Sequence, residues 1–469
     1  MESIRLDKKI GFPYSVVGKK QKQKERWNPM AEIVIDLKLK LNIPEDGVKV
    51  NNLLYQLRKF MAELYFGILR AIFSALEEQA IEKLKRSYPG RYVKNGRRSS
   101  GRQIRTAYGL FRYRLARVLD KQTRCTLTPL TEAIDWPRYC RHVKEAAEGA
   151  IGLVCHLSYR KSVKEMERIL GTQMSKSTLH RQVQEFGGSV CHWPDLKKIP
   201  YRFLMVDGTK VRLQEVDETG HRKKVEMRWA LASLEEKQKF DLVGIWIDKS
   251  WQKIRQDLNH KLNYSNLEVL FSDGGPGIEE NLLDPGMRHQ RCLWHGRRDF
   301  PYILYADKLK KAQQQPLKDK LKSIPALNLN QADLEQLTPK DLPKVKKLAE
   351  KTEQGFKELI EALPEDKYPK ARAYIENLSR NVTTFFDIWF AKGFWIPLNT
   401  NAIESAFSQV KNRIWTIGKR WSEAGLLNWL KVVVKKVFFP YSWNQLWTEY
   451  LGIDSTLQFK LVEVRYQWL

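Results

Sequence analysis

The chain of 469 residues contains 42% hydrophobic residues and 15 Trp, a composition that excludes a largely disordered protein. Its 82 Lys and Arg residues exceed its 54 Asp and Glu residues by 28, which predicts a polyanionic partner, either nucleic acid or a membrane surface. The sequence has no apolar run of 18 or more residues, and its start lacks the apolar core of a signal peptide, so we expect no membrane partner. Five scattered cysteines suggest no disulfide framework, and we expect a reduced, cytoplasmic protein.

Residues 1–88 are expected to form a basic lead segment followed by a helical region. Residues 1–30 contain the run KKQKQKERW and show little periodicity. From residue 48 to 88, apolar residues recur at three- and four-residue spacing, and no Pro or Gly occurs before Gly67. This pattern predicts a long amphipathic helical region.

Residues 89–195 are expected to form a basic hairpin followed by a helix-turn-helix-like, DNA-binding region. Residues 90–124 hold 11 basic residues and one acid, Asp120, and Gly109 marks a turn between alternating strands. A basic ribbon with interleaved aromatic residues suits phosphate contact, although a solvated hairpin would show the same pattern. The candidate phosphate contacts are Arg97, Arg98, Arg102 and Arg105.

Two short helices are predicted between residues 141 and 187. The first ends at Leu170-Gly171, and Ser175 is a good N-cap for the second. This is helix-turn-helix spacing, but plain helical packing explains it equally well. If the second helix contacts DNA, its exposed N-terminal residues would be Lys176, Ser177, His180 and Arg181.

From residue 196 to residue 301 the sequence pattern differs from the preceding helical region and predicts short apolar strands. Three strands, a helix, a strand, a short helix and a fifth strand follow one another, and the fifth strand runs into a helix. This is the order of elements in an RNase H-like domain. We therefore expect an α/β fold with an RNase H-like catalytic core, preceded by the mainly helical DNA-binding region.

The second half of this core is expected after a long helical insertion. Residues 302–395 are rich in Lys, Glu, Leu and Ala, are punctuated by Pro, and contain no convincing strand. Helix resumes at Asn401, so residues 396–445 are expected to complete the core, and residues 446–469 to form a C-terminal tail.

Two acids follow apolar runs in this core. Asp207 follows FLMV and precedes Gly208, and Asp273 follows VLFS and precedes Gly274. Each could be a turn-forming Asp-Gly pair. However, the first and fourth strands of the expected order lie adjacent and parallel, which would bring both acids to the same edge of the sheet. Converging carboxylates are what two-metal phosphodiester chemistry needs.

Glu404 is the candidate for a third carboxylate. It lies in the segment PLNTNAIESAFSQVKNR, where Asn401 followed by Glu404 is also a capping-box pattern. A capping Glu needs no metal, and the residues alone do not favour Glu404 over Glu423.

Cys292 and His295 form a CLWH motif with a spacing seen in zinc sites. A zinc site needs about four ligands, and the sequence shows no second matching pair nearby. A buried Cys beside a hydrogen-bonded His is the simpler interpretation.

Taken together, Asp207, Asp273, Glu404, the CLWH motif and the helical insertion resemble the Mutator-like group of DDE transposases, including their bacterial and archaeal insertion-sequence relatives. The resemblance covers about residues 140–440. It selects Glu404 over Glu423, because Asn-Ala-Ile-Glu is similar to the glutamate motif of that family.

The resemblance implies that Asp207, Asp273 and Glu404 bind two Mg²⁺ or Mn²⁺ ions and catalyse DNA cleavage and strand transfer. Cys292 and His295 would then support the site. The implied partners are the terminal inverted repeats of the element and the target DNA, both double-stranded, bound by at least a dimer in the nucleoid. Residues 405–440 hold seven Lys or Arg and one acid, which suits phosphate contact by Lys411 and Arg413.

Two alternatives remain open at this stage. The chain could be an RNase H-like nuclease or resolvase that cuts DNA without strand transfer. It could also be an inactive transposase relic that only binds DNA.

Overall fold

The computed structural model describes residues 33–37, 39–42, 44–136, 144–171, 173–189, 191–193, 195–235, 239–417, 420–453 and 459–460. The basic segment expected over residues 1–30, and most of the expected tail, lie outside these residues. The fold is mixed α/β and divides into two compact units, one of residues 1–101 and 113–137 and the other of residues 102–112 and 138–469. None of the helices in the described ranges has the length and apolarity needed to cross a membrane.

The first unit is built on one long helix. Its α1 (Val50–Ser87) confirms the helix expected over residues 48–88. The carboxylate of Glu77, buried on α1, accepts hydrogen bonds from the Ala116 amide (2.6 Å) and the Tyr113 hydroxyl (3.1 Å), and pairs with Arg97 at 2.9 Å. These bonds satisfy a buried charge and fix the strands to the helix. The strands and the short helix of this unit are β1 (Tyr92–Arg97), β4 (Ala116–Asp120), β5 (Thr126–Leu127) and α2 (Pro129–Ala133).

The second unit begins with a short two-stranded sheet and a helical group. The turn expected at Gly109 lies at the two preceding residues, Ala107 and Tyr108, and Gly109 begins β3. The two expected helices are confirmed: the first ends at Gly171 in a left-handed conformation (φ 69°), and the Ser175 hydroxyl caps the second by accepting from the Thr178 amide at 3.1 Å. The elements are β2 (Arg102–Thr106), β3 (Gly109–Tyr113), α3 (Glu148–Val154), α4 (Tyr159–Leu170) and α5 (Lys176–Ser189).

A five-stranded sheet forms the centre of this unit among the described residues. Its order is β10-β9-β6-β7-β8, in which β6, β9 and β10 run parallel and β7 is antiparallel to both β6 and β8. All the strands expected over residues 196–301 are confirmed, and the first and fourth are adjacent and parallel as expected. The strands are β6 (Phe203–Val216), β7 (Arg222–Ser233), β8 (Asp241–Ile247), β9 (Val269–Ser272) and β10 (Arg288–Arg291).

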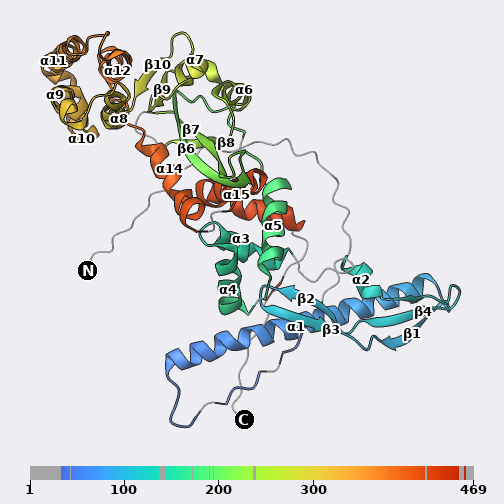
Figure 1. The fold of residues 1–469 in the computed structure, drawn as a ribbon. Helices are drawn as coiled ribbons and strands as arrows, with labels where there is room; N and C mark the ends of the chain where they lie inside the picture. Colours follow the sequence, from blue (N-terminus) through green and yellow to red (C-terminus); the bar gives the residue numbers. More distant parts are fainter. Residues whose placement is uncertain are drawn as a thin grey trace. The chain divides into compact units, whose positions relative to one another are not determined.

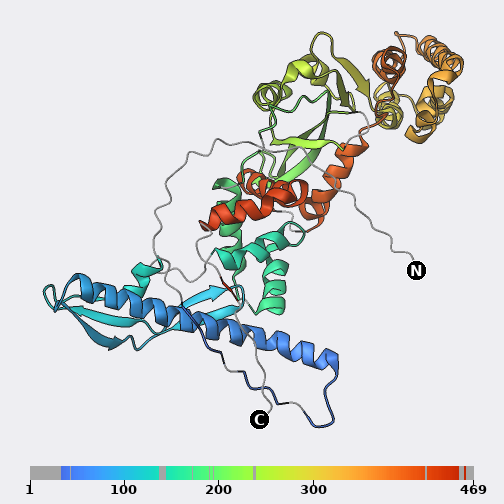
Figure 2. The same ribbon diagram turned by 180° about the vertical axis from the view of Figure 1, so that it is seen from behind.

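Helices cover both faces of the sheet, because successive side chains of a strand point to opposite sides. Leu204 and Val206 pack in the apolar cluster that contains α6 (Trp251–Lys261) and α7 (Ile278–Leu282). Phe203 and Met205 belong to the cluster on the other face, which contains α14 (Asn401–Lys411) and α15 (Glu423–Val433). Figures 1 and 2 show these helices on opposite sides of the sheet.

Between β10 and α14 the described residues form helices and loops, with no strand. The first begins at Leu293, before the boundary expected at residue 302. The Gln290 side chain of β10 donates to the Val382 carbonyl (3.0 Å) and accepts from the Phe385 amide (2.9 Å), which ties the helical segment to the sheet. The helices are α8 (Leu293–Ala306), α9 (Lys311–Ser323), α10 (Gln331–Glu335), α11 (Leu342–Glu361), α12 (Pro369–Asn381) and α13 (Thr384–Lys392).

The last described helix, α16 (Trp443–Leu451), continues past residue 445, where a tail was expected. Its Trp447 is buried and stacks on Phe186 of α5 with 4.5 Å between ring centroids. Residues 446–451 are therefore part of the packed helical structure.

Candidate active site

Asp207 and Asp273 lie at corresponding points of two adjacent parallel strands, Asp207 within β6 and Asp273 directly after the last residue of β9. Met205 of β6 pairs with Phe271 of β9, and each acid lies two residues further along its strand direction. Residues two apart in a strand share a face, so Asp207, like Met205, projects to the side of the sheet on which α14 packs. Asp207 itself remains within β6, paired with Trp229, so the alternative of a turn at Asp207-Gly208 is wrong. Asp273 does open a turn, and its Oδ1 accepts from the Gly275 amide at 2.9 Å.

Two of the candidate acids, Asp273 and Glu404, act electrostatically on the third, Asp207. Asp207 is buried, with 7% of its surface exposed. Burial, and then the negative charge of Asp273, raise the pKa of Asp207 to about 7, and Glu404 contributes in the same direction. The Gly208 amide (2.6 Å) and His295 oppose this rise. Asp207, Asp273, Glu404 and His295 therefore share one electrostatic neighbourhood.

Glu404 lies in the first turn of α14, but not as a capping residue. The N-cap is Thr400, whose side chain makes no capping hydrogen bond, and the Asn401 amide donates instead to Oδ1 of Asn399 at 3.2 Å. The Glu404 side chain is 44% exposed, and its Oε1 lies 3.6 Å from Nε2 of His295. Glu423 lies elsewhere, at the start of α15, and together with the dominant Asp248 it raises the pKa of Lys223. Glu404 thus contacts His295 and acts on the pKa of Asp207, whereas Glu423 acts on the pKa of Lys223.

Cys292 and His295 lie beside the acids, between β10 and α14. Cys292 is the N-cap of α8, and its amide donates to the Ser272 carbonyl at 2.8 Å. Burial acts to raise the pKa of the Cys292 thiol, but hydrogen bonds with His295 and Thr400 outweigh it and lower the pKa. Burial likewise acts to lower the pKa of His295, and Cys292 outweighs it and raises the pKa. Cys292 and His295 are therefore both buried and hydrogen-bonded to each other, and His295 also contacts Glu404.

The described residues include no group of three or more His, Cys, Asp or Glu side chains close enough together to hold a metal ion. In this arrangement Glu404 faces His295. Asp273 and Glu404 therefore act on the pKa of Asp207, but the three carboxylates do not together form a coordination shell in this structure.

A buried hydrogen-bonded chain that the sequence did not predict supports the turn at Asp273. The Ser272 hydroxyl accepts from the Gly274 amide (3.0 Å) and lies 2.8 Å from Nε2 of His289, whose Nδ1 lies 2.8 Å from Glu279. The order Ser-His-Glu is the one that serine hydrolases use. Ser272 is fully buried, however, so this chain holds the loop and does not present a nucleophile.

Two arginines that the sequence did not single out, Arg291 and Arg298, also lie near the acids. Arg291 is buried and donates to the Asp273 carbonyl at 3.2 Å. Gly274 has φ 80°, and a Cβ there would overlap the Arg291 guanidinium, so this position requires Gly. The pKa of Arg298 is raised mainly by its hydrogen bond with Asp299, and also by Asp273 and Glu404. No sequence signal marks these residues, because basic residues are frequent throughout the chain.

Arg413 corrects the expectation of a phosphate contact. Only 3% of its surface is exposed. Its guanidinium donates to the carbonyls of Leu157 (2.9 Å) and Ile417 (2.5 Å) and lies 4.7 Å from the centroid of the Trp421 ring. Burial lowers the pKa of Arg413. Arg413 is a structural residue that joins α14 to the helical group of α3–α5.

The other candidate DNA contacts are distributed over several elements and are not gathered at the acids. Arg97 pairs with the buried Glu77, and Arg105 donates to the Gln173 carbonyl, so both also have structural roles. Arg102 is half-buried. The exposed candidates are Arg98, Lys176, Ser177, His180, Arg181 and Lys411.

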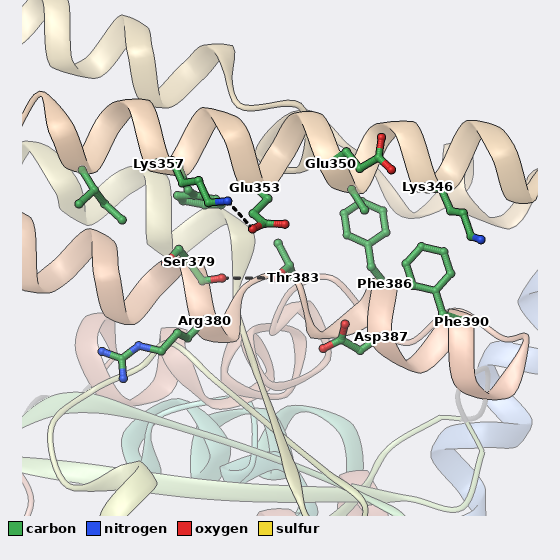
Figure 3. A pocket seen from close by; sticks show the side chains of 13 residues that line it. Lys346, Glu350, Glu353, Lys357, Ser379, Arg380, Thr383, Phe386, Asp387 and Phe390 are labelled. Carbon is green, nitrogen blue, oxygen red and sulfur yellow. Dashed lines mark hydrogen bonds and ion pairs between the residues drawn. The ribbon is translucent and has the colours of Figure 1, made fainter.

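A groove of about 540 Å³ lies between α11, α12 and α13, away from these residues (Figure 3). Phe386 and Phe390 of α13 line it, facing the charged residues of α11. Lys357 and Glu353 pair with each other at 2.8 Å. The groove contains none of the candidate site residues, and we do not include it in the site.

Comparison with known proteins gives one family. Residues 136–443 match the family described as "Transposase, Mutator family". No curated protein matches the chain. Among solved structures, the chain is similar to the "Drosophila P element transposase strand transfer complex", with 14% sequence identity, a TM-score of 0.25, and coverage of 68% of this chain and 82% of that chain. A TM-score this low does not establish a shared fold, so the sequence match alone identifies the family.

Proposed function

Because the chain belongs to the Mutator family of transposases, we propose that it cleaves and joins DNA with Asp207, Asp273 and Glu404 as its catalytic acids. The observation that supports this assignment most is the position of Asp207 on β6 and of Asp273 directly after the adjacent parallel strand β9, where the charge of Asp273 acts on the pKa of Asp207. Glu404 acts electrostatically on the same buried carboxyl group.

In this proposal the five-stranded sheet is an RNase H-like core. Three antiparallel strands, β8-β7-β6, followed by two strands parallel to β6, are the arrangement that the order of elements predicts. The helices α8–α13 are then the insertion that separates Glu404 from the two Asp residues.

In this proposal the carboxylates of Asp207, Asp273 and Glu404 would hold two Mg²⁺ or Mn²⁺ ions. Both ions prefer hard oxygen ligands, and Mg²⁺ commonly takes only one or two carboxylates, with water and substrate phosphate completing its shell. Burial first, and then the charges of Asp273 and Glu404, raise the pKa of Asp207, and a bound cation would oppose this rise. Bound metal ions would activate the attacking oxygen and stabilise the leaving oxygen.

The residues of the chain would then have distinct tasks. Asp207 and Asp273, fixed by the sheet, hold the reaction centre at one place. The contact of His295 with Glu404 orients the third carboxylate (3.6 Å), and Thr400 lies 3.5 Å from the other ring nitrogen of His295. Water attacks phosphorus at the element ends and breaks the P–O3′ bond, which frees a 3′-hydroxyl; this hydroxyl then attacks a target phosphate and displaces the 3′-oxygen of the target strand. Both attacks are in line, so one site serves both.

We propose double-stranded DNA as the partner, in the form of the terminal inverted repeats and the target. The whole-chain charge of +28 supports a phosphate-rich ligand. The exposed N-terminal residues of α5 and the exposed Lys411 of α14 are the proposed contacts. Pairing of two element ends implies at least a dimer in the DNA complex.

A strand-transfer assay tests this function. Purified full-length protein, Mg²⁺ and a duplex carrying the terminal repeats that flank the reading frame are incubated with plasmid target DNA. A transposase joins the 3′ end of the repeat to the plasmid. Cutting of the repeat without joined product would instead indicate a nuclease or resolvase, and binding without cutting would indicate an inactive DNA-binding protein.

A further inference from the structure

One face of α8 carries an exposed row of aromatic and basic side chains. Trp294, Tyr302 and Tyr305 are 47%, 72% and 75% exposed. Arg298 lies between them, with its guanidinium 4.8 Å from the centroid of the Trp294 ring. Spacings of four, four and three residues place all four side chains on one side of a helix. We call these four residues the α8 stripe.

The opposite face of α8 is firmly packed. Leu293, Phe300 and Leu304 are buried in the core of the second unit. The Tyr374 hydroxyl of α12 donates to the Gly296 carbonyl at 3.0 Å. The α8 stripe is therefore presented by a fixed helix, and its aromatic rings lose little further freedom when a ligand binds.

The α8 stripe begins at the candidate active site and leads away from it. Trp294 is the neighbour of His295, which contacts Glu404, and the two rings lie 4.9 Å apart. The negative charges of Asp273 and Glu404 both contribute to raising the pKa of Arg298, after the larger effect of Asp299. At the helical rise of 1.5 Å per residue, the row from Trp294 to Tyr305 extends about 16 Å along the helix.

A basic groove runs beside the first part of the α8 stripe. It has a volume of about 330 Å³ and lies between α8 and α9. Besides Trp294 and Arg298, its lining includes Arg297, Lys318 and Lys322. Aromatic side chains in a row beside cations are the combination with which proteins bind single-stranded nucleic acid, since bases stack on the rings and phosphates pair with the cations.

We propose that the α8 stripe binds unpaired nucleotides of the DNA strand next to the cleaved phosphate, with bases stacked on Trp294, Tyr302 and Tyr305. This inference rests on the proposed transposase function, because it places the strand relative to the catalytic acids. Bases of an intact duplex are stacked on each other and offer no free face to these rings. The α8 stripe therefore selects DNA that is frayed or single-stranded at the site of cleavage.

The test compares two DNA ligands in buffer without divalent ions, so that no cleavage occurs. The full-length protein is titrated against a labelled duplex with a single-stranded tail and against the same duplex with blunt ends. We expect the wild type to bind the tailed duplex more tightly. The variant with Trp294→Ala, Tyr302→Ala and Tyr305→Ala loses about tenfold or more of its affinity for the tailed duplex and little for the blunt one.

Matched variants separate stacking from other effects. Trp294→Phe with Tyr302→Phe and Tyr305→Phe keeps three rings and retains the affinity for tailed DNA. Tyr441→Ala, which removes another exposed aromatic residue, changes neither affinity. The inference is overturned if the triple Ala variant binds tailed DNA like the wild type, or loses affinity equally for both ligands. If the wild type binds neither DNA, the proposed function itself fails.

Discussion

Asp207, a metal ligand in the proposed function, carries a cost in stability. Its pKa of about 7 lies above the value of an exposed Asp, so the folded protein without metal ions binds the Asp207 proton more tightly than the unfolded chain does. From about pH 4, where the unfolded group ionises, to about pH 7, this residue therefore makes the free energy of unfolding fall as pH rises.

The variant Asp207→Asn removes this cost. We expect it to raise the melting temperature of the protein in EDTA by about 2–4 °C at pH 8, and by less at pH 5, while it abolishes DNA cleavage. Thermal unfolding at both pH values measures the difference. An equal change at pH 5 and pH 8, or a lower melting temperature at pH 8, would contradict the assigned burial cost.

Ser272 is expected to position the loop of Asp273 without touching substrate. Ser272→Ala removes the acceptor of the Gly274 amide and the partner of His289. Loss of such supporting bonds lowers the activity of metal sites by about 10- to 100-fold, and we expect a fall of this size in the cleavage rate with unchanged DNA affinity. The control is Ser265→Ala, at an exposed position. Reduced DNA affinity with a normal rate would show that Ser272 does not act on the site.

At the scale of elements, the contact of α5 with α15 depends on Gly187. A Cβ at this position would overlap the backbone oxygen of Asn428, whereas a Cβ at the adjacent Gly188 would meet its nearest atom at 3.6 Å, an ordinary contact. Gly187→Ala is therefore expected to lower the free energy of unfolding by about 1–3 kcal/mol. Gly188→Ala should leave it unchanged or raise it slightly, because Ala favours helix. Urea unfolding distinguishes them, and equal stability of the two variants would refute the close packing.

The strands and the convergence of Asp207 with Asp273 were predictable from the sequence, because apolar runs and their order determine the register of a buried sheet. The continuation of β6 beyond Asp207 was not, since an Asp-Gly pair alone resembles a turn. The burial of Arg413 was not predictable either, because its partner Leu157 is distant in sequence. The chain from Ser272 to Glu279 follows no periodic spacing and becomes visible only in three dimensions.

At the scale of the whole molecule, the charge of +28 predicts DNA binding that weakens steeply with salt. Each phosphate contact contributes about −0.9 to the slope of log K against log salt. Lys411→Ala is expected to make the slope shallower by about one contact without changing stability. Arg413→Lys is expected to lower the melting temperature and leave the slope unchanged, since Arg413 is buried. The reverse pattern in salt titrations would restore Arg413 as a phosphate contact.

The central claim is that Asp207, Asp273 and Glu404 form one catalytic site, and Glu404 is the member that only the family resemblance selected from the sequence. The most direct measurement is Mg²⁺-dependent cleavage of terminal-repeat DNA by Glu404→Gln and Glu423→Gln, each checked for DNA binding. We predict that Glu404→Gln binds DNA but does not cleave it, like Asp207→Asn and Asp273→Asn, and that Glu423→Gln cleaves like the wild type. Cleavage by Glu404→Gln at the wild-type rate would contradict the account.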